Sequence, residues 1–176
     1  MAGPDAARHL VLVGLMATGK STVGRLLAEA LDRPLLDSDD QVEAMTGRSV
    51  REIWQTDGEQ AFRRLETAAL TAALADETPS VVAGAGGVVL AQENRVLLAA
   101  DHVEVVWLRA APSTLIARVA AAGDGHRPLL DDDPAGMLER MEAARRKLYE
   151  SVADRIVDVD DRTPDAVAAA ILEATP

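Results

Sequence analysis

The chain of 176 residues contains no cysteine, which excludes disulfide bonds and thiolate-bound zinc. It has no unbroken run of about 18 apolar residues, so no membrane-spanning helix is predicted. Lysine and arginine number 18 against 29 aspartate and glutamate, a formal net charge of −11, and this acidic balance argues against a nucleic-acid-binding protein. The first residues, Met1 to Asp5, lack the cationic and apolar regions of a signal peptide, and we expect a cytoplasmic protein.

Aromatic residues make up only 2 % of the chain, so alanine, leucine and valine must fill its core. The hydrophobic content of 48 % is that of an ordinary globular protein. This length predicts a single domain over residues 1–176, with residues 1–8 frayed. We expect it to be a monomer.

Short apolar runs alternate with segments of helical periodicity along the chain, which predicts a parallel sheet in a three-layer α/β/α domain. A loop rich in glycine, proline and aspartate, at about 121–134, interrupts the pattern and is expected to be mobile. The predicted strands cover 9–14, 34–37, 80–83, 103–108 and 155–159, and the predicted helices cover 20–31, 40–46, 50–54, 58–74, 93–100, 112–121, 134–149 and 164–172.

Residues Gly14 to Ser21 match the phosphate-binding loop (P-loop) pattern G-x-x-x-x-G-K-[ST] in full, between a predicted strand and a predicted helix. Backbone N–H groups of such a loop form an anion-binding nest, and the helix N-terminus favours phosphate. Lys20 would reach the β- and γ-phosphates, and the Ser21 hydroxyl would ligate Mg²⁺. A chance strand–glycine–helix junction is the alternative. The motif predicts a nucleoside triphosphate site but not its use.

Two carboxylates, Asp37 and Asp39, leave the end of the second predicted strand, where they would face the ligand crevice of an open sheet. One would hold a magnesium-bound water and the other an acceptor hydroxyl. An acidic turn that caps the next helix is the alternative.

Three arginines, Arg63, Arg127 and Arg145, would suit a carboxylate or phosphate ligand in so acidic a chain, although each alone fits a solvated surface position. The glycine run from Gly84 to Gly87 would let a ligand approach the backbone closely, or is a plain strand-to-helix turn. The three histidines lack the spacing of metal ligands.

Together these motifs resemble the shikimate kinase family over roughly residues 9 to 172. They occur in the family's order: the P-loop, the Asp37–Asp39 pair, Gly58-Glu59 with the segment 62–66, the glycine run, the segment 127–130, and Arg145 with Tyr149 and Ala153. The resemblance implies a P-loop kinase fold with strand order 2-3-1-4-5, and a lid over about 121–134. It also implies Mg²⁺- and ATP-dependent phosphorylation of shikimate in aromatic amino-acid biosynthesis.

The same resemblance implies roles for individual residues. Asp39 binds the acceptor hydroxyl and takes its proton, while Arg127 swings in with the lid and stabilises charge on the transferring phosphoryl group. Asp37 organises the water shell of a metal ion held by Ser21. Shikimate is held by Asp39, Arg63, Gly84, Ala85, Gly86 and Arg145, and ATP by Gly14, Ala17, Thr18, Gly19, Lys20, Ser21, Thr22, Arg118, Arg127 and Pro164.

Two positions depart from the family pattern. Ala17 replaces a glycine of the usual Gly-x-x-Gly-x-Gly-Lys, and we expect a small effect on ATP binding if its φ is negative. Ala85 replaces the middle residue of a Gly-Gly-Gly run, where a methyl group would point towards the ring pocket or strain the turn. The second departure bears on substrate and rate, not on fold.

Three other functions are compatible with the P-loop. The chain would then phosphorylate a related small polyhydroxylated acid or a nucleoside monophosphate, or act as a nucleotide-binding module without an acceptor. The joint presence of Asp39, Arg63, Arg127 and Arg145 speaks against the module, because a pure sensor needs no acceptor site.

Overall fold

The computed structural model describes residues 8–121 and 133–173. Its centre is a parallel sheet in the order β2-β3-β1-β4-β5, which confirms the predicted order. β1 lies in the middle, with Leu12 opposite Ala83 of β3 and Val13 opposite Trp107 of β4. The strands span His9–Val13 (β1), Leu35–Asp37 (β2), Val81–Ala83 (β3), Val103–Arg109 (β4) and Arg155–Asp158 (β5).

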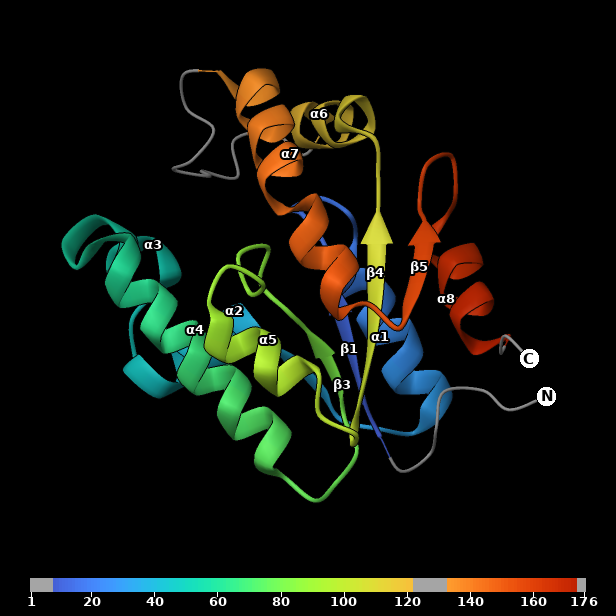
Figure 1. Cartoon of the computed structure of the whole chain (residues 1–176), viewed down its shortest axis with the longest axis horizontal. Coiled ribbons are helices and arrows are strands. Elements are labelled where there is room, and N and C mark those ends of the chain that lie inside the picture. Colours follow the sequence, from blue (N-terminus) through green and yellow to red (C-terminus); the bar gives the residue numbers. More distant parts are fainter. Residues whose placement is uncertain (1–7, 122–132, 174–176) are drawn as a thin grey trace.

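Helices cover both faces of this sheet (Figure 1). α1 and α8 pack together on one face, α5 and α7 lie on the other, and α2 and α3 pack against α4. The helices span Lys20–Leu31 (α1), Ser38–Thr46 (α2), Val50–Thr56 (α3), Gly58–Ala75 (α4), Gln92–Leu98 (α5), Pro112–Ala121 (α6), Pro134–Val152 (α7) and Pro164–Leu172 (α8).

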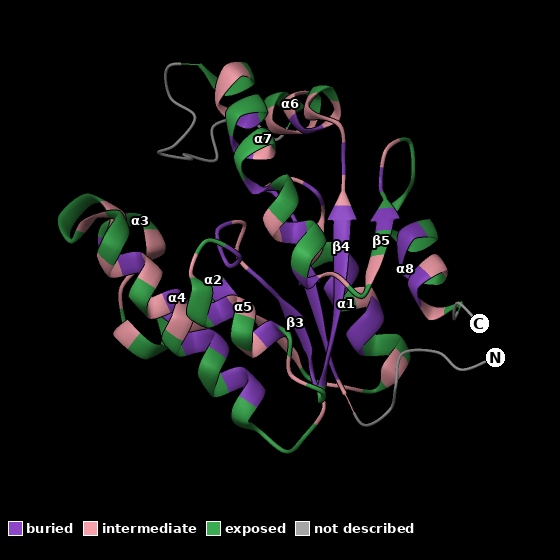
Figure 2. Cartoon of the chain, viewed as in Figure 1, coloured by how far each residue is buried: buried purple, intermediate pink, exposed green. Residues whose placement is uncertain are grey.

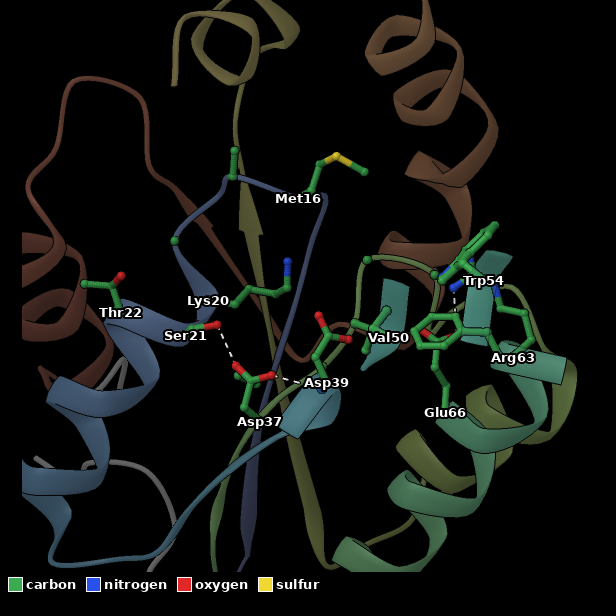
Figure 3. A pocket seen from close by; sticks show the side chains of 18 of the residues that line it. Met16, Lys20, Ser21, Thr22, Asp37, Asp39, Val50, Trp54, Arg63 and Glu66 are labelled. Carbon is green, nitrogen blue, oxygen red and sulfur yellow. Dashed lines mark hydrogen bonds and ion pairs between the residues drawn. The ribbon is translucent and has the colours of Figure 1, made fainter. Parts of the chain in front are cut away.

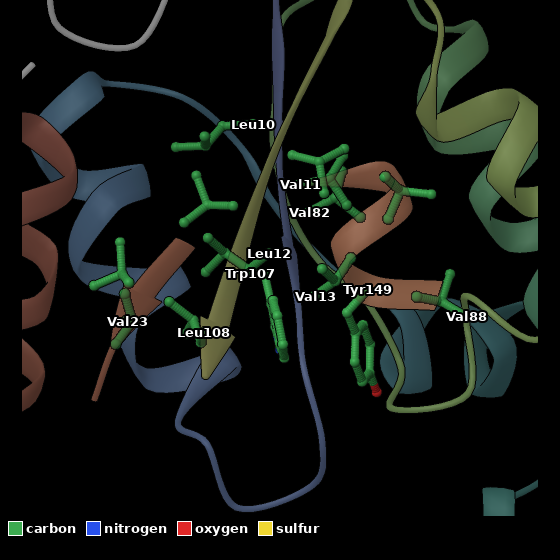
Figure 4. Packing of buried hydrophobic residues seen from close by; sticks show 14 of the residues in the cluster. Leu10, Val11, Leu12, Val13, Val23, Val82, Val88, Trp107, Leu108 and Tyr149 are labelled. Atoms are coloured by element: carbon green, nitrogen blue, oxygen red, sulfur yellow. The ribbon is translucent and has the colours of Figure 1, made fainter. Parts of the chain in front are cut away.

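The main core surrounds β1, whose residues are buried on both sides (Figure 2). This explains why the strand is apolar throughout rather than alternating. Figure 4 shows valines and leucines of the strands filling the space towards the helices. A second small cluster of Val42, Ile53, Phe62 and Ala69 joins α2, α3 and α4. Burial of each of the three larger side chains, Val42, Ile53 and Phe62, contributes roughly 1.5–3 kcal/mol.

The predicted strands and helices are present with boundaries shifted by at most three residues, and two of these shifts have identifiable reasons. α2 begins at Ser38 rather than Asp40, because the Asp37 carboxylate accepts a hydrogen bond of 3.0 Å from the Asp39 N–H and caps the helix. α7 continues beyond Tyr149 to Val152, and both residues are buried on its packed side. Most of the predicted lid, residues 122–132, lies outside the described residues.

None of the helices within residues 8–121 and 133–173 combines the length and apolarity that a membrane crossing requires. The carboxyl ends of the strands meet at one edge of the sheet, and there the chain passes from β1 into α1 and from β3 towards α5. In open α/β sheets ligands bind in the crevice outside this edge. The fold therefore places the candidate residues on one side of the molecule.

Candidate active site

The P-loop runs from β1 into α1 in the predicted position. Gly14 has a φ of +144°, and a Cβ there would lie 2.5 Å from the carbonyl oxygen of Leu108, so only glycine fits. The Lys20 ammonium donates hydrogen bonds of 2.9 and 2.8 Å to the carbonyls of Gly14 and Leu15. The buried Thr18 hydroxyl also donates to Leu15, at 2.8 Å. These bonds fix the loop around the end of α1.

Ala17 has a φ of +62°, in the left-handed region. We expected only a small effect on ATP binding if the φ of Ala17 were negative, and this condition is not met. A side chain in this conformation costs about 1–2 kcal/mol relative to glycine. The P-loop of this chain holds that strain at a residue that lines the cavity.

Oxygen donors for a metal ion lie beside the loop. The Ser21 hydroxyl donates a 2.6 Å hydrogen bond to the Asp37 carboxylate, although the residues come from α1 and β2. A hydroxyl and a single carboxylate suit Mg²⁺, which usually keeps several waters and shares its ligands with substrate phosphates. No cluster of three or more histidine, aspartate or glutamate side chains suited to a metal occurs in the described part of the chain.

A cavity of about 650 Å³ opens in front of the P-loop (Figure 3). Lys20 and Asp39 point into it from the α1 and α2 sides, and Arg63 and Glu66 stand on the α4 side. Asp39 is open to water in the cavity, yet burial among the surrounding atoms, together with the Asp37 charge, raises its carboxyl pKa above the usual 3.8. Its carboxylate is thus less stable than in water and readier to take a proton.

Two arginines from distant helices meet at the far end of the cavity. Arg63 of α4 lies over the rings of Trp54 and Phe62, with its Cζ 5.7 Å from each ring centroid. Arg145 of α7 is buried and donates a 2.9 Å hydrogen bond to the Gly86 carbonyl. Both line the cavity, so this end suits an anionic group such as a carboxylate.

The segment from Gly84 to Gly87 forms the cavity wall between the two arginines and the P-loop. Ala85 lines the cavity and is not among the described non-glycine residues with positive φ, which are Ala17, Asp32 and Asp161. Of the two expected consequences of its methyl group, the structure fits a position at the pocket and not a strained turn.

Only some of the remaining residues predicted to bind ATP lie at the cavity. Gly19, Thr22 and Arg118 line the cavity, and Arg118 reaches the carbonyls of Ala17 at 3.2 Å and Val159 at 2.8 Å. Pro164, the first residue of α8, is not among the lining residues. Arg127 lies outside the described residues, so its role stays a prediction.

Comparison with known proteins shows the family. The family model "Shikimate kinase" matches residues 16–176. A curated shikimate kinase of Symbiobacterium thermophilum is 45 % identical over 166 residues, 94 % of each chain. The chain belongs to the shikimate kinase family. A solved structure described as shikimate kinase from Acinetobacter baumannii in complex with shikimate superposes with a TM-score of 0.89 and 33 % identity, over 96 % of this chain and 93 % of the other.

Other P-loop kinases share the fold alone. A gluconokinase from Sinorhizobium meliloti has a TM-score of 0.64 at 20 % identity, over 96 % of this chain and 91 % of its own. Shikimate kinases are small-molecule kinases that use ATP as co-substrate, and membership therefore makes this chain a member of that enzyme class.

Glu66 lies at the site of this shikimate kinase family member although the sequence motifs predict no role for it. Its side chain is 2 % exposed, lines the cavity, and pairs with Arg63 at 2.6 Å. Its other oxygen has no hydrogen-bond partner among the described residues. Burial raises the Glu66 carboxyl pKa, and the Arg63 charge opposes the rise.

A signal for Glu66 was present in the sequence. Glu66 shares its helix face with Phe62, Ala69, Leu70 and Ala73, all of which are buried. A glutamate on such a face is rarely buried without a partner. Periodicity therefore marks it as a paired or functional carboxylate.

Proposed function

We propose that this chain transfers the γ-phosphoryl group of ATP to the 3-hydroxyl of shikimate, giving shikimate 3-phosphate and ADP. One observation carries the proposal. A single cavity has Lys20 and the P-loop at one end, Asp39 between, and Arg63 and Arg145 at the other, where Arg145 contacts Gly86 and Arg63 lies beside Gly87. This order matches a phosphate donor, a hydroxyl and a carboxylate. The Acinetobacter baumannii relative, whose complex holds shikimate, supports this acceptor.

In the proposed reaction, Arg63 and Arg145 hold the acceptor carboxylate, so that the hydroxyl lies at Asp39. The hydroxyl oxygen forms a bond to the γ-phosphorus while the bond from that phosphorus to the β–γ bridging oxygen breaks. The hydroxyl proton passes to the Asp39 carboxylate, and ADP leaves. Positioning and charge stabilisation supply most of the rate in such transfers.

Ser21 and Asp37 would hold Mg²⁺, Asp37 through water, and their oxygen donors fit that ion. When bound, the ion neutralises charge on the β- and γ-phosphates. Lys20 serves the same phosphates, after leaving the carbonyls of Gly14 and Leu15. From the family resemblance we also propose that Arg127 stabilises the transferring group and that Arg118 and Pro164 flank adenine.

The test is ADP release in a coupled assay with ATP and Mg²⁺, with and without shikimate. Shikimate-dependent turnover at roughly 1–100 s⁻¹ is expected, the usual range of kinases. A matched reaction with quinate, gluconate or a nucleoside monophosphate in place of shikimate controls for a broader acceptor range.

The negative outcomes separate the alternatives. Turnover with another hydroxy acid and none with shikimate would contradict the proposed acceptor and point to the Ala85 methyl group at the pocket. ATP binding without turnover on any acceptor would instead identify a nucleotide-binding module.

A further inference from the structure

The phenol of Tyr149 is one of the largest fully buried side chains, with 1 % exposure. Its hydroxyl donates a 2.6 Å hydrogen bond to the carbonyl oxygen of Gly86. The same oxygen accepts the 2.9 Å hydrogen bond from Arg145, one helical turn earlier on α7. One carbonyl of the cavity wall is thus held by two donors from one helix.

Gly86 stands next to the P-loop as well as the cavity. A Cβ built at Gly86 would lie 3.4 Å from the backbone nitrogen of Met16 and 3.6 Å from the carbonyl oxygen of Gly14. Gly86 also lines the cavity, as Arg145 does. The carbonyl that Tyr149 holds therefore lies where the acceptor end meets the nucleotide end.

The position of the phenol ring is itself fixed. Its ring stacks on Trp107 of β4, with centroids 5.5 Å apart and planes at 21° (Figure 4). Trp107 pairs with Val13, the last residue before the P-loop. A side chain wedged between a helix and the central strands holds its hydroxyl in one place, because the ring has no room to turn away.

The hydroxyl is a permanent donor. Burial raises the pKa of Tyr149 to about 12, although the nearby Arg145 charge opposes the rise. The phenol therefore keeps its proton at neutral pH. A donor here offsets the partial negative charge of the carbonyl, which would otherwise repel an acceptor carboxylate.

We propose that Tyr149 is a positioning residue for the acceptor: through the Gly86 carbonyl it fixes the guanidinium of Arg145 and the cavity wall beside it. The proposal rests on the proposed function, in which Arg145 holds the acceptor carboxylate. Tyr149 itself does not touch the acceptor, since it is not among the residues that line the cavity.

The test is Tyr149→Phe, which removes the hydroxyl and keeps the ring. We expect the KM for shikimate to rise about tenfold, since a lost hydrogen bond is of that order. kcat and the KM for ATP should change less than about twofold, because neither reacting centre loses a contact. An unchanged KM for shikimate in Tyr149→Phe would overturn the proposal.

A matched control separates the hydroxyl from the packing. Val152→Ala removes buried packing from the same helix and leaves the Tyr149 hydroxyl and the Gly86 carbonyl untouched. It should lower the melting temperature and leave the KM for shikimate as it is. An equal rise in KM for Val152→Ala would mean that loosened packing of α7 alone is responsible, and would overturn the proposal.

A double-mutant cycle tests the route through Arg145. Arg145→Lys keeps the charge but loses the planar fork that binds a carboxylate with two parallel bonds. Adding Tyr149→Phe to Arg145→Lys should lower kcat/KM for shikimate by less than about twofold, against about tenfold in the unmodified chain. The same tenfold loss in both backgrounds would refute the route. If the unmodified chain does not turn over shikimate at all, the proposed function fails instead.

Discussion

The phosphate-binding part of the proposed nucleotide end comes from one unbroken segment, residues 14–22, which joins a central strand to a helix, and Arg118 of α6 lines the cavity beside it. The acceptor end is assembled from four segments, with contributions from Asp39, Arg63, Glu66, Gly86 and Arg145. In the first region the groups expected to bind phosphate are mostly backbone N–H groups, so the geometry of this region is local. In the second, buried side-chain charges must be held by other side chains across the fold.

This difference has an energetic consequence. A P-loop presents N–H groups and a helix N-terminus, whose partial charges are built into the backbone. The acceptor end instead keeps Glu66 and Arg145 away from water, and an unpaired charge there is costly. Substitutions at the acceptor end should therefore change acceptor binding sharply while leaving ATP binding intact.

The largest effect is expected at Asp39, where the two regions meet. Asp39→Asn keeps the shape and removes the proton acceptor, so kcat should fall about 10²–10⁴-fold with an unchanged KM for ATP, since general-base catalysis is of that size. Asp40→Asn, an exposed neighbour on α2, is the control and should leave kcat as it is. A kcat within twofold of the unmodified chain would exclude Asp39 as the base.

The raised pKa of Asp39 also predicts a dependence of stability on pH. When a carboxyl has a higher pKa in the folded state than in the unfolded state, the folded protein loses stability as the pH rises through the folded-state pKa. At a pH above that raised pKa, Asp39→Asn should therefore melt at a higher temperature than the unmodified chain. The difference should vanish below the ordinary pKa of 3.8, and thermal melts at both pH values measure it.

The second-largest effect, on the KM for shikimate, should differ between the two glutamates that pair with Arg63. Glu66 is 2 % exposed and binds Arg63 at 2.6 Å, whereas Glu59 is 52 % exposed and binds it at 3.0 Å. Glu66→Gln should raise the KM for shikimate about tenfold or more, because a buried pair is poorly screened. Glu59→Gln should change it less than about twofold, since exposed pairs contribute little.

Steady-state kinetics with shikimate varied at saturating ATP measures both variants. Equal effects of the two substitutions would mean that burial does not distinguish the partners of Arg63. The contrast between a local nucleotide end and a buried acceptor end would then be wrong at this position.

The same contrast decides what could be predicted from the sequence. The position of the P-loop between a strand and a helix was predicted correctly, because its residues are adjacent and its flanking strand and helix have clear periodicity. The meeting of Arg63 and Arg145 was not predictable from spacing, since it depends on how α4 and α7 pack on the sheet. The family resemblance supplied that pairing, and the strand order, in place of a physical derivation.

In each region of the cavity, one structural feature could not be predicted from the sequence. The φ of Ala17 is set by how the loop closes around Lys20, and residue type gives only a preference for negative values. The stacking of Tyr149 on Trp107 and its hydrogen bond to Gly86 depend on how α7 packs on the sheet. Both belong to tertiary structure and not to any local pattern.

The smallest effect is expected at Ala17, and it tests whether the nucleotide end depends on backbone alone. Ala17→Gly relieves a left-handed conformation that costs about 1–2 kcal/mol. Glycine also gives the unfolded chain more conformational entropy, which lowers the free energy of the unfolded state by about 0.4–1 kcal/mol. A net stabilisation of the folded protein of about 0.5–1 kcal/mol should remain. Ala143→Gly, at an exposed position within α7, is the opposite control, because glycine in a helix costs about 1 kcal/mol. Denaturant unfolding measures both, and the KM for ATP should stay the same in each variant. A destabilised Ala17→Gly would mean that the methyl group makes favourable contacts at the cavity, and that the nucleotide end relies on side chains as the acceptor end does.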